Sequence, residues 1–201
     1  MTGGVQVTGE GLSCRRGDRL LFAGLSFSAP AGSLTAVTGP NGSGKTSLIR
    51  MIAGLLKPEA GTLRVSGAGA GDEAAADLLH YLGHHDALKS QMTARENLTF
   101  AARWFGVSGD PGMALERLGL KRQADLPVGY FSAGQRKRTA LARCWMLGRP
   151  LWLLDEPTAA LDADGRALVL DLIAAHAAAG GTVIAATHDP LGKDAAEIAV
   201  A

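Results

Sequence analysis

The chain has 201 residues and a mass of 20.7 kDa, with 47% hydrophobic and 19% charged residues. This balance is typical of a globular protein and excludes a disordered one. Twenty Lys and Arg against nineteen Asp and Glu give a net charge of +1. The chain therefore lacks the strong positive electrostatic field that would indicate nucleic acid as a partner. No apolar run reaches about 18 residues, so no membrane-spanning helix is expected, and work at a membrane would need a separate partner. The two cysteines, Cys14 and Cys144, cannot build a disulfide framework and are expected to be buried thiols.

The first half of the chain alternates short apolar runs with turns. Strands are predicted at 5–8 and 20–22, separated by a turn at 16–18, and at 34–38, where the run ends in a glycine-rich loop. A helix is predicted over 46–53, because Gly54 is a stop signal. A strand at 63–65, a helix over 72–79 and an extended segment at 81–82 follow.

The second half becomes helical at Thr93. The Thr-Ala-Arg-Glu sequence at 93–96 fits a capping box that opens a helix through Trp104, and further helices are predicted at 113–118, 135–147 and 166–179. Buried strands are predicted at 151–154 and 182–186, and Trp145 and Trp152 are expected in the core. Strands separated by helices predict a mostly parallel α/β sheet. We therefore expect one domain over 1–201, with a core of 1–85 and 135–201 and an inserted helical subdomain over 86–134.

The strongest chemical signal is a glycine-rich run that matches the phosphate-binding loop pattern GxxxxGK[ST]. Backbone N–H groups of such a loop cradle phosphate oxygens, the lysine reaches the β- and γ-phosphates, and the Thr hydroxyl holds Mg²⁺. The alternative is a glycine-rich turn in a glycine-rich chain, which composition would produce in roughly one such chain in a hundred. The candidate nucleotide-binding residues are Gly39, Pro40, Asn41, Gly42, Ser43, Gly44, Lys45 and Thr46.

A second signal is the buried strand that ends in paired acids, Asp155 and Glu156. Asp155 is predicted to hold Mg²⁺, together with Thr46, and Glu156 to polarise or deprotonate the attacking water. The alternative is a helix N-cap after a core strand. The phosphate loop makes the metal and water roles the better interpretation.

Three further motifs carry a family resemblance. They are Tyr-Phe-Ser-Ala-Gly-Gln-Arg at 130–136, Ala-Leu-Asp at 160–162 and Thr-His-Asp at 187–189. In this order, after the phosphate loop, they resemble the signature, dimer-contact loop and switch histidine of ABC-type ATPases. The resemblance implies a P-loop NTPase with a RecA-like core, an N-terminal antiparallel β subdomain and an inserted helical subdomain. It also implies a head-to-tail dimer of two copies, in which each ATP lies between one phosphate loop and the partner's signature. The implied contact residues are His188, on the γ-phosphate or the water, and Ser132, Ala133, Gly134, Gln135 and Asp162 at the dimer contact.

The chain departs from the family pattern at several positions. His84 stands where the family usually has a glutamine that senses Mg²⁺ and the γ-phosphate, so His84 is a candidate nucleotide or metal ligand, with a surface loop as the alternative. Arg16 replaces the aromatic residue that stacks on adenine; a guanidinium can also stack, and a solvated turn arginine is the alternative. Within the signature, Phe131 replaces leucine and Ala133 replaces glycine.

These departures also indicate a branch of the family. The runs at 12–16, 81–85, 142–146 and 151–157 together resemble the ATP-binding subunits of the bacterial haem exporter of cytochrome c maturation. That resemblance implies ATP and Mg²⁺ as cofactors and a peripheral subunit on the cytoplasmic face of the inner membrane. Its partners would be the integral membrane subunits of the cytochrome c maturation complex. ATP hydrolysis would be coupled to haem export or to release of the haem-loaded periplasmic chaperone.

Two other functions stay open at this point. One is an ABC ATPase for another cargo, such as a lipid, a metal or a drug. The other is a soluble, non-transport ABC protein, which the single phosphate loop and the near-neutral charge disfavour.

Overall fold

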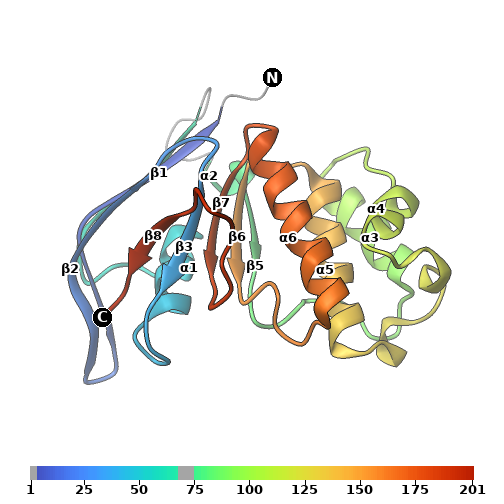
Figure 1. Ribbon diagram of the computed structural model, residues 1–201, viewed down its shortest axis with the longest axis horizontal. Helices are drawn as coiled ribbons and strands as arrows, with labels where there is room; N and C mark the ends of the chain where they lie inside the picture. The colour runs from blue at the N-terminus through green and yellow to red at the C-terminus, as the bar shows by residue number, and fades with distance from the viewer. Residues whose placement is uncertain (1–3, 68–74) are drawn as a thin grey trace. The chain divides into compact units, whose positions relative to one another are not determined.

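The computed structural model describes residues 4–67 and 75–201 (Figure 1). They group into two compact units. The first unit contains residues up to Gly83 together with Pro150–Glu156 and Ile173–Ala201, and the second contains His84–Arg149 and Pro157–Leu172. The predicted helix 72–79 lies partly outside the described residues; within them, α2 spans Ala75–Leu78.

The N-terminal part of the first unit is an antiparallel sheet. Its strands β1 (Val5–Arg16), β2 (Arg19–Ala29) and β4 (Ala60–Gly67) have the order β2-β1-β4. The three strands predicted here are confirmed but are much longer than expected. The pairing of β1 shifts register three times along β2, and each shift interrupts the alternation of apolar and polar residues that marks a strand in the sequence.

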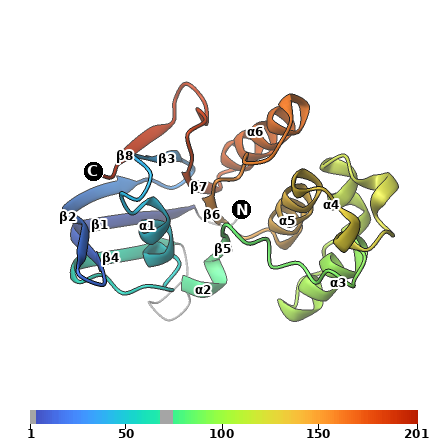
Figure 2. The ribbon, with the colours of Figure 1, turned by 90° about the horizontal axis from the view of Figure 1, so that it is seen from below.

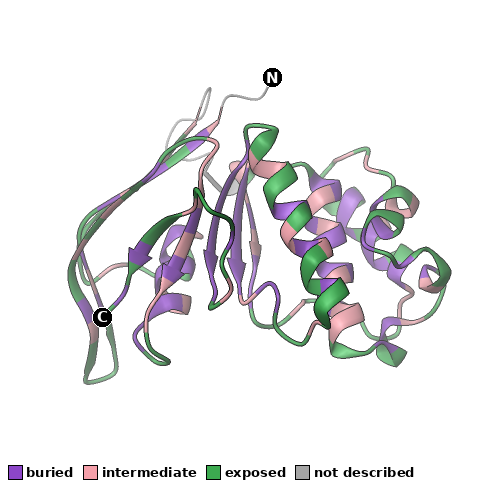
Figure 3. Ribbon diagram, in the orientation of Figure 1, coloured by how far each residue is buried: buried purple, intermediate pink, exposed green. Residues whose placement is uncertain are grey.

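The second sheet of this unit has the order β5-β6-β7-β3-β8, with parallel pairing throughout. It contains β3 (Leu34–Thr38), β5 (Leu79–Leu82), β6 (Leu151–Asp155), β7 (Thr182–Ala186) and β8 (Ala196–Ala199). Every residue of β6 and β7 is buried (Figure 3), as expected for strands covered on both faces. The predicted parallel α/β sheet is therefore confirmed.

Helix α1 (Lys45–Ile52) packs on strands of both sheets (Figure 2). Its buried side chains Leu48, Ile49, Met51 and Ile52 join residues of both sheets in one apolar core. The helix ends as predicted before Gly54, whose φ of 73° suits glycine. This packing fixes the start of α1, and with it the loop that precedes the helix.

The second unit is helical. It contains α3 (Ala94–Trp104), α4 (Pro111–Arg117) and α5 (Ala133–Leu147), two short 3₁₀ turns, and the first part of α6 (Ala163–Ala178). No strand occurs between residues 84 and 149, in agreement with the sequence. The unit also includes α5, which the predicted division assigns to the core; that division stays a prediction.

Two smaller expectations have different outcomes. Trp152 is 1% exposed, but Trp145 is only half-buried, with the Arg117 guanidinium 5.5 Å from the centre of its ring, so the prediction that Trp145 lies in the core is wrong. Both cysteines are buried and free, as predicted. Over residues 4–67 and 75–201, no helix has both the length and the apolar character needed to cross a membrane.

Candidate functional site

The predicted phosphate loop connects β3 to α1 and depends on its glycines. Gly39 and Gly44 have φ values of 136° and 113°, which L side chains rarely adopt. A Cβ on Gly39 would lie 2.1 Å from the Val200 carbonyl oxygen, and a Cβ on Gly44 would lie 2.9 Å from the Phe22 ring. The loop can therefore turn tightly against its neighbours only because both positions lack a side chain.

Two polar groups of this loop are positioned for an anion. Lys45 is buried, and its Nζ donates to the carbonyl oxygens of Gly39 (2.8 Å) and Pro40 (3.0 Å). Ser43 Oγ is also buried and has no hydrogen-bond partner among the described residues. An unpaired buried hydroxyl costs free energy, so a phosphate oxygen at this loop would satisfy a group that the protein leaves unsatisfied. The loop therefore fits the triphosphate that its sequence predicts.

Thr46 and Asp155 meet at the start of α1 and the end of β6. Thr46 Oγ1 donates to Asp155 Oδ1 over 3.1 Å, and Asp155 is 3% exposed. A hydroxyl and a carboxylate are the oxygen ligands that Mg²⁺ prefers. Mg²⁺ takes six oxygen ligands and usually keeps several waters, so phosphate and water would fill the positions that these two side chains leave. The residues present fit a nucleotide-bound Mg²⁺.

Glu156 and His188 follow the neighbouring strands β6 and β7. Glu156 has a φ of 49°, rare for a residue with a side chain, and its N–H donates to the Ala186 carbonyl oxygen over 2.8 Å. Its carboxylate lies 3.7 Å from His188 Nε2, with side-chain exposures of 31% for Glu156 and 60% for His188. This separation exceeds a direct hydrogen bond and suits two groups that share a water molecule.

The hairpin between β1 and β2 brings a residue to the loop that sequence reasoning missed. Arg16 and Arg19 are paired across a two-residue turn, and both are exposed. Arg19 Nη1 lies 3.8 Å from the position that a Cβ on Gly42 would take. The signal was present in the sequence, because a tight turn at Gly17-Asp18 would place the two arginines side by side.

The predicted signature residues start α5 in the second unit. Ser132 is the N-cap: its Oγ accepts from the Gln135 N–H over 3.2 Å, and Gln135 Oε1 accepts from the Ser132 N–H over 3.0 Å. Ala133 is exposed, and a Cβ on Gly134 would lie 2.9 Å from the Ala160 carbonyl oxygen. Asp162 Oδ1 accepts from the Gly165 N–H over 2.9 Å at the start of α6. Two helix starts therefore carry these residues, and their predicted roles toward ATP stay predictions.

His84 is exposed and lies edge-to-face with His85, with ring centres 5.5 Å apart. It lines a cavity of about 230 Å³ in the second unit, together with Asp86, Ala133, Arg136, Lys137, Ala159 and Ala160. His84 therefore shares a cavity with the first residue of α5. Its role as a nucleotide or metal ligand stays a prediction.

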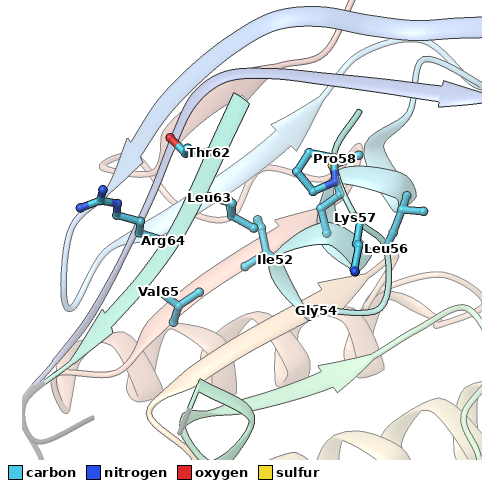
Figure 4. Close-up of a pocket in the computed structure, with 10 residues that line it drawn as sticks. Ile52, Gly54, Leu56, Lys57, Pro58, Thr62, Leu63, Arg64 and Val65 are labelled. Atoms are coloured by element: carbon cyan, nitrogen blue, oxygen red, sulfur yellow. The ribbon is translucent and has the colours of Figure 1, made fainter. Parts of the chain in front are cut away.

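A larger hollow of about 630 Å³ lies in the first unit between the end of α1 and β4 (Figure 4). Its lining includes Ile52, Leu63 and Val65, and the cations Lys57 and Arg64. It contains none of the predicted site residues. The larger hollow therefore does not coincide with the predicted phosphate loop.

Comparison with known proteins gives a consistent picture. The family model described as ABC transporter matches residues 22–159. The protein named cytochrome c biogenesis ATP-binding export protein CcmA from Rhizobium meliloti (strain 1021) is 49% identical over 193 residues, which are 94% of this chain and 93% of the relative. The protein of the same name from Rhodopseudomonas palustris (strain BisB5) is 49% identical over 197 residues, 96% of this chain and 97% of the relative.

Solved structures share the fold. An ABC transporter ATP-binding protein of Pyrococcus furiosus superimposes with a TM-score of 0.83 at 22% identity, covering 97% of each chain. A bacterial Atm1-family ABC exporter with ATP bound gives a TM-score of 0.78 at 22% identity, covering 94% of this chain and 35% of the exporter.

Proposed function

The chain belongs to the ABC transporter family and to its branch of cytochrome c biogenesis ATP-binding export proteins, and we propose that it hydrolyses ATP to drive the haem exporter of c-type cytochrome biogenesis. Hydrolysis would be coupled to haem export or to release of the haem-loaded periplasmic chaperone. The observation that carries the proposal is the contact of Thr46 with Asp155 at the phosphate loop, with Glu156 as the next residue.

In the proposed reaction, the N–H groups of Gly39–Thr46 and the Lys45 ammonium bind the phosphates. Thr46 and Asp155 would hold Mg²⁺, which would neutralise phosphate charge. Glu156 accepts the proton of a water molecule whose oxygen bonds to the γ-phosphorus, while the bond from that phosphorus to the β,γ-bridging oxygen breaks. The products are ADP and phosphate. His188 orients the water or contacts the γ-phosphate, and the 3.7 Å separation from Glu156 leaves both groups within reach of one water.

The site is completed by a second copy of the chain. The start of α5, with Ser132, Ala133, Gly134 and Gln135, would face the γ-phosphate held by the partner's loop, and Asp162 would lie at the dimer contact. A 15-residue helix presents partial positive charge at its first turn, which suits an anion. His84 would sense the γ-phosphate in place of glutamine. Arg16 and Arg19 together would flank the nucleotide at the hairpin.

An aromatic patch on the second unit is the proposed contact with the integral membrane subunits. It consists of Phe100, Trp104 and Phe105, which are 45%, 75% and 44% exposed. The Phe100 and Trp104 rings stack with centres 6.3 Å apart, and Lys89 and Arg149 lie over Phe100 and Phe105. Exposed aromatic side chains with a charged rim are typical of protein contacts. Through this patch the chain would be held peripherally at the cytoplasmic face of the inner membrane.

Replacement of Glu156 by Gln tests the reaction. The amide keeps the shape of the carboxylate but cannot accept a proton, so ATP still binds and turnover of the assembled complex falls by about 10²–10⁴. Lys45→Ala should lose ATP binding. Glu10→Gln, on an exposed position of β1, is the matched control and should leave turnover unchanged. Normal turnover in Glu156→Gln would remove Glu156 from its proposed role.

The export role needs a test in cells. Deletion of the gene should abolish periplasmic holocytochromes c, and the Glu156→Gln variant should not restore them. Undiminished holocytochrome after deletion would point to another cargo.

A further inference from the structure

The loop that follows β5, residues 84–92, is tied to α5 by an ion pair. Arg136 Nε and Nη2 donate to the two carboxylate oxygens of Asp86 over 2.8 and 3.0 Å. The side chains are 27% exposed for Arg136 and 19% for Asp86. Two parallel hydrogen bonds from one guanidinium to one carboxylate, a fork-like pairing, fix both the distance and the orientation of the two side chains. Asp86 therefore sits at a defined place beside the first turn of α5.

The backbone of the same loop has its own ties. Arg143, further along α5, donates to the carbonyl oxygens of Asp86 (2.9 Å) and Ala87 (3.3 Å). The Leu88 N–H donates to Asp86 Oδ1 over 3.0 Å. Ala87 has a φ of 54°, a conformation that costs free energy in a residue with a side chain and persists only where neighbours hold it. The loop is therefore held in one strained shape.

The far end of the loop is attached to α3. Asn97 is 6% exposed; its Oδ1 accepts from the Lys89 N–H over 2.8 Å, and its Nδ2 donates to the Lys89 carbonyl oxygen over 3.1 Å. With both ends attached to helices of the second unit, the loop forms one body with α3 and α5.

The charge of Asp86 is secured by the same contacts. Burial raises the pKa of Asp86, but hydrogen bonds from Arg136 and the Leu88 N–H, with the charges of Arg136 and Arg143, bring that pKa below its ordinary value. The carboxylate is therefore ionised at neutral pH and keeps its attraction to both arginines.

We propose that Asp86 and Arg136 are a positioning pair that makes the loop at His84 and the start of α5 move together, so that the two ATP sites of the dimer are coupled. The proposal rests on the proposed function. His84 would respond to the ATP bound by its own chain, and Ser132–Gln135 would contact the ATP bound by the partner. A rigid tie between these segments transmits occupancy of one site to the other. Without the tie, the loop can respond to ATP while α5 stays in place.

The experiment measures the ATP dependence of hydrolysis by the assembled complex. Wild type should show a Hill coefficient above 1. Asp86→Asn and Arg136→Gln should bring the coefficient close to 1 and raise the half-saturating ATP concentration about fivefold or more, with turnover at saturating ATP changed less than about twofold. Arg136→Lys keeps the charge but not the fork, so its coefficient should lie between those of wild type and Arg136→Gln. Arg136→Lys leaves Asp86 unchanged, so it still tests the proposal if the Asp86→Asn protein does not fold.

The second unit offers a matched control. Arg95 and Asp125 form a two-bond pair of similar geometry, at 2.7 and 3.3 Å, that is more exposed (45% and 76%). It ties α3 to the loop at Asp125 and involves no predicted ATP-contacting segment. Asp125→Asn should leave the Hill coefficient and half-saturation unchanged. Equal effects of Asp125→Asn and Asp86→Asn would overturn the proposal, because the pair would then act only through general stability.

The failure of the proposed function gives a different pattern. A wild-type complex with no ATP turnover above that of Lys45→Ala would refute the proposed function and, with it, the coupling. Cooperative turnover that persists unchanged in Asp86→Asn and Arg136→Gln would refute the positioning pair alone.

Discussion

Ser43→Ala should change stability and nucleotide binding in opposite directions. Ser43 Oγ is buried in the phosphate loop without a hydrogen-bond partner among the described residues. Leaving a buried hydroxyl unpaired costs about 1–3 kcal/mol. Alanine removes this oxygen and keeps the rest of the side chain, so the nucleotide-free protein should become more stable by that amount. For a chain of this length, each kcal/mol corresponds to about 2–4 °C in Tm.

The same substitution should weaken ATP binding. In the proposed complex the hydroxyl donates to a phosphate oxygen, and a hydrogen bond to a charged group contributes about 1.5–3 kcal/mol. Its loss raises the Kd for ATP roughly 10- to 150-fold. ATP at a concentration that raises the Tm of wild type should therefore raise the Tm of Ser43→Ala much less.

Thermal unfolding with and without Mg²⁺ and ATP measures both effects. Ser33→Ala is the control, because the Ser33 hydroxyl donates to the Pro30 carbonyl oxygen over 2.7 Å and lies outside the loop. It should not stabilise the nucleotide-free protein, and it should leave the shift caused by ATP intact. A nucleotide-free Ser43→Ala protein that melts below wild type, or one with the full ATP shift, would refute the reasoning.

Three other predictions concern the first and second units separately. Burial lowers the pKa of His176 despite its hydrogen bond to the Pro150 carbonyl, so just below about pH 6.5 the unfolded chain binds more protons than the folded one. The unfolding free energy should therefore fall from pH 7 to 5.5, by at most about 1.4 kcal/mol per pH unit. His176→Phe should flatten this slope in urea titrations. Burial raises the pKa of Cys144 to about 12, so iodoacetamide should label it at pH 8 at least about 100-fold more slowly than in urea, as followed by mass spectrometry. Gly44→Ala should destabilise the protein by about 1–3 kcal/mol and lower ATP affinity in calorimetry, because its φ of 113° and the Phe22 ring exclude a side chain.

The core strands were predictable because a strand that is buried on both faces is a nearly continuous run of hydrophobic residues. The predicted strands 151–154 and 182–186 are short apolar or β-branched runs, and the structure buries every residue of both. The phosphate loop was predictable for a different reason: the chemistry fixes the residue types and their spacing, so the pattern is readable without any fold. The capping box at Thr93 is local in the same sense, and its two reciprocal hydrogen bonds are present.

Features that depend on distant contacts were not predictable. Strand β8 was missed, because only Ile198 among its four residues is buried and an edge strand of this kind has no alternation to detect. The Asp86–Arg136 pair joins residues 50 positions apart, and neither the charge pattern nor any motif indicates it. Arg19 was missed although the turn at Gly17-Asp18 places it beside Arg16, because nothing in the sequence indicates that this end of β2 lies beside Gly42.

The sheet order explains how residues from three parts of the chain come together at the proposed reaction site. Strands β6, β7 and β3 are consecutive neighbours and run parallel, so their carboxyl ends meet at one edge. The phosphate loop follows β3, Asp155 and Glu156 lie at the end of β6, and His188 follows β7. Ligands of open parallel sheets bind at this edge. In the proposed reaction, the first unit therefore supplies the groups for the phosphates, the metal and the water.

In the proposed dimer the partner copy closes the site, and the capping box at the start of α5 is compatible with that task. Ser132 Oγ accepts from the Gln135 N–H, which uses one of its lone pairs. Its hydroxyl hydrogen is not required by the cap and can be donated to a phosphate oxygen. The helix can thus stay capped while Ser132 contacts the γ-phosphate, so closure of the dimer need not unwind α5. Ser132→Ala should therefore remove both the bond from the Gln135 N–H and the proposed bond to the γ-phosphate.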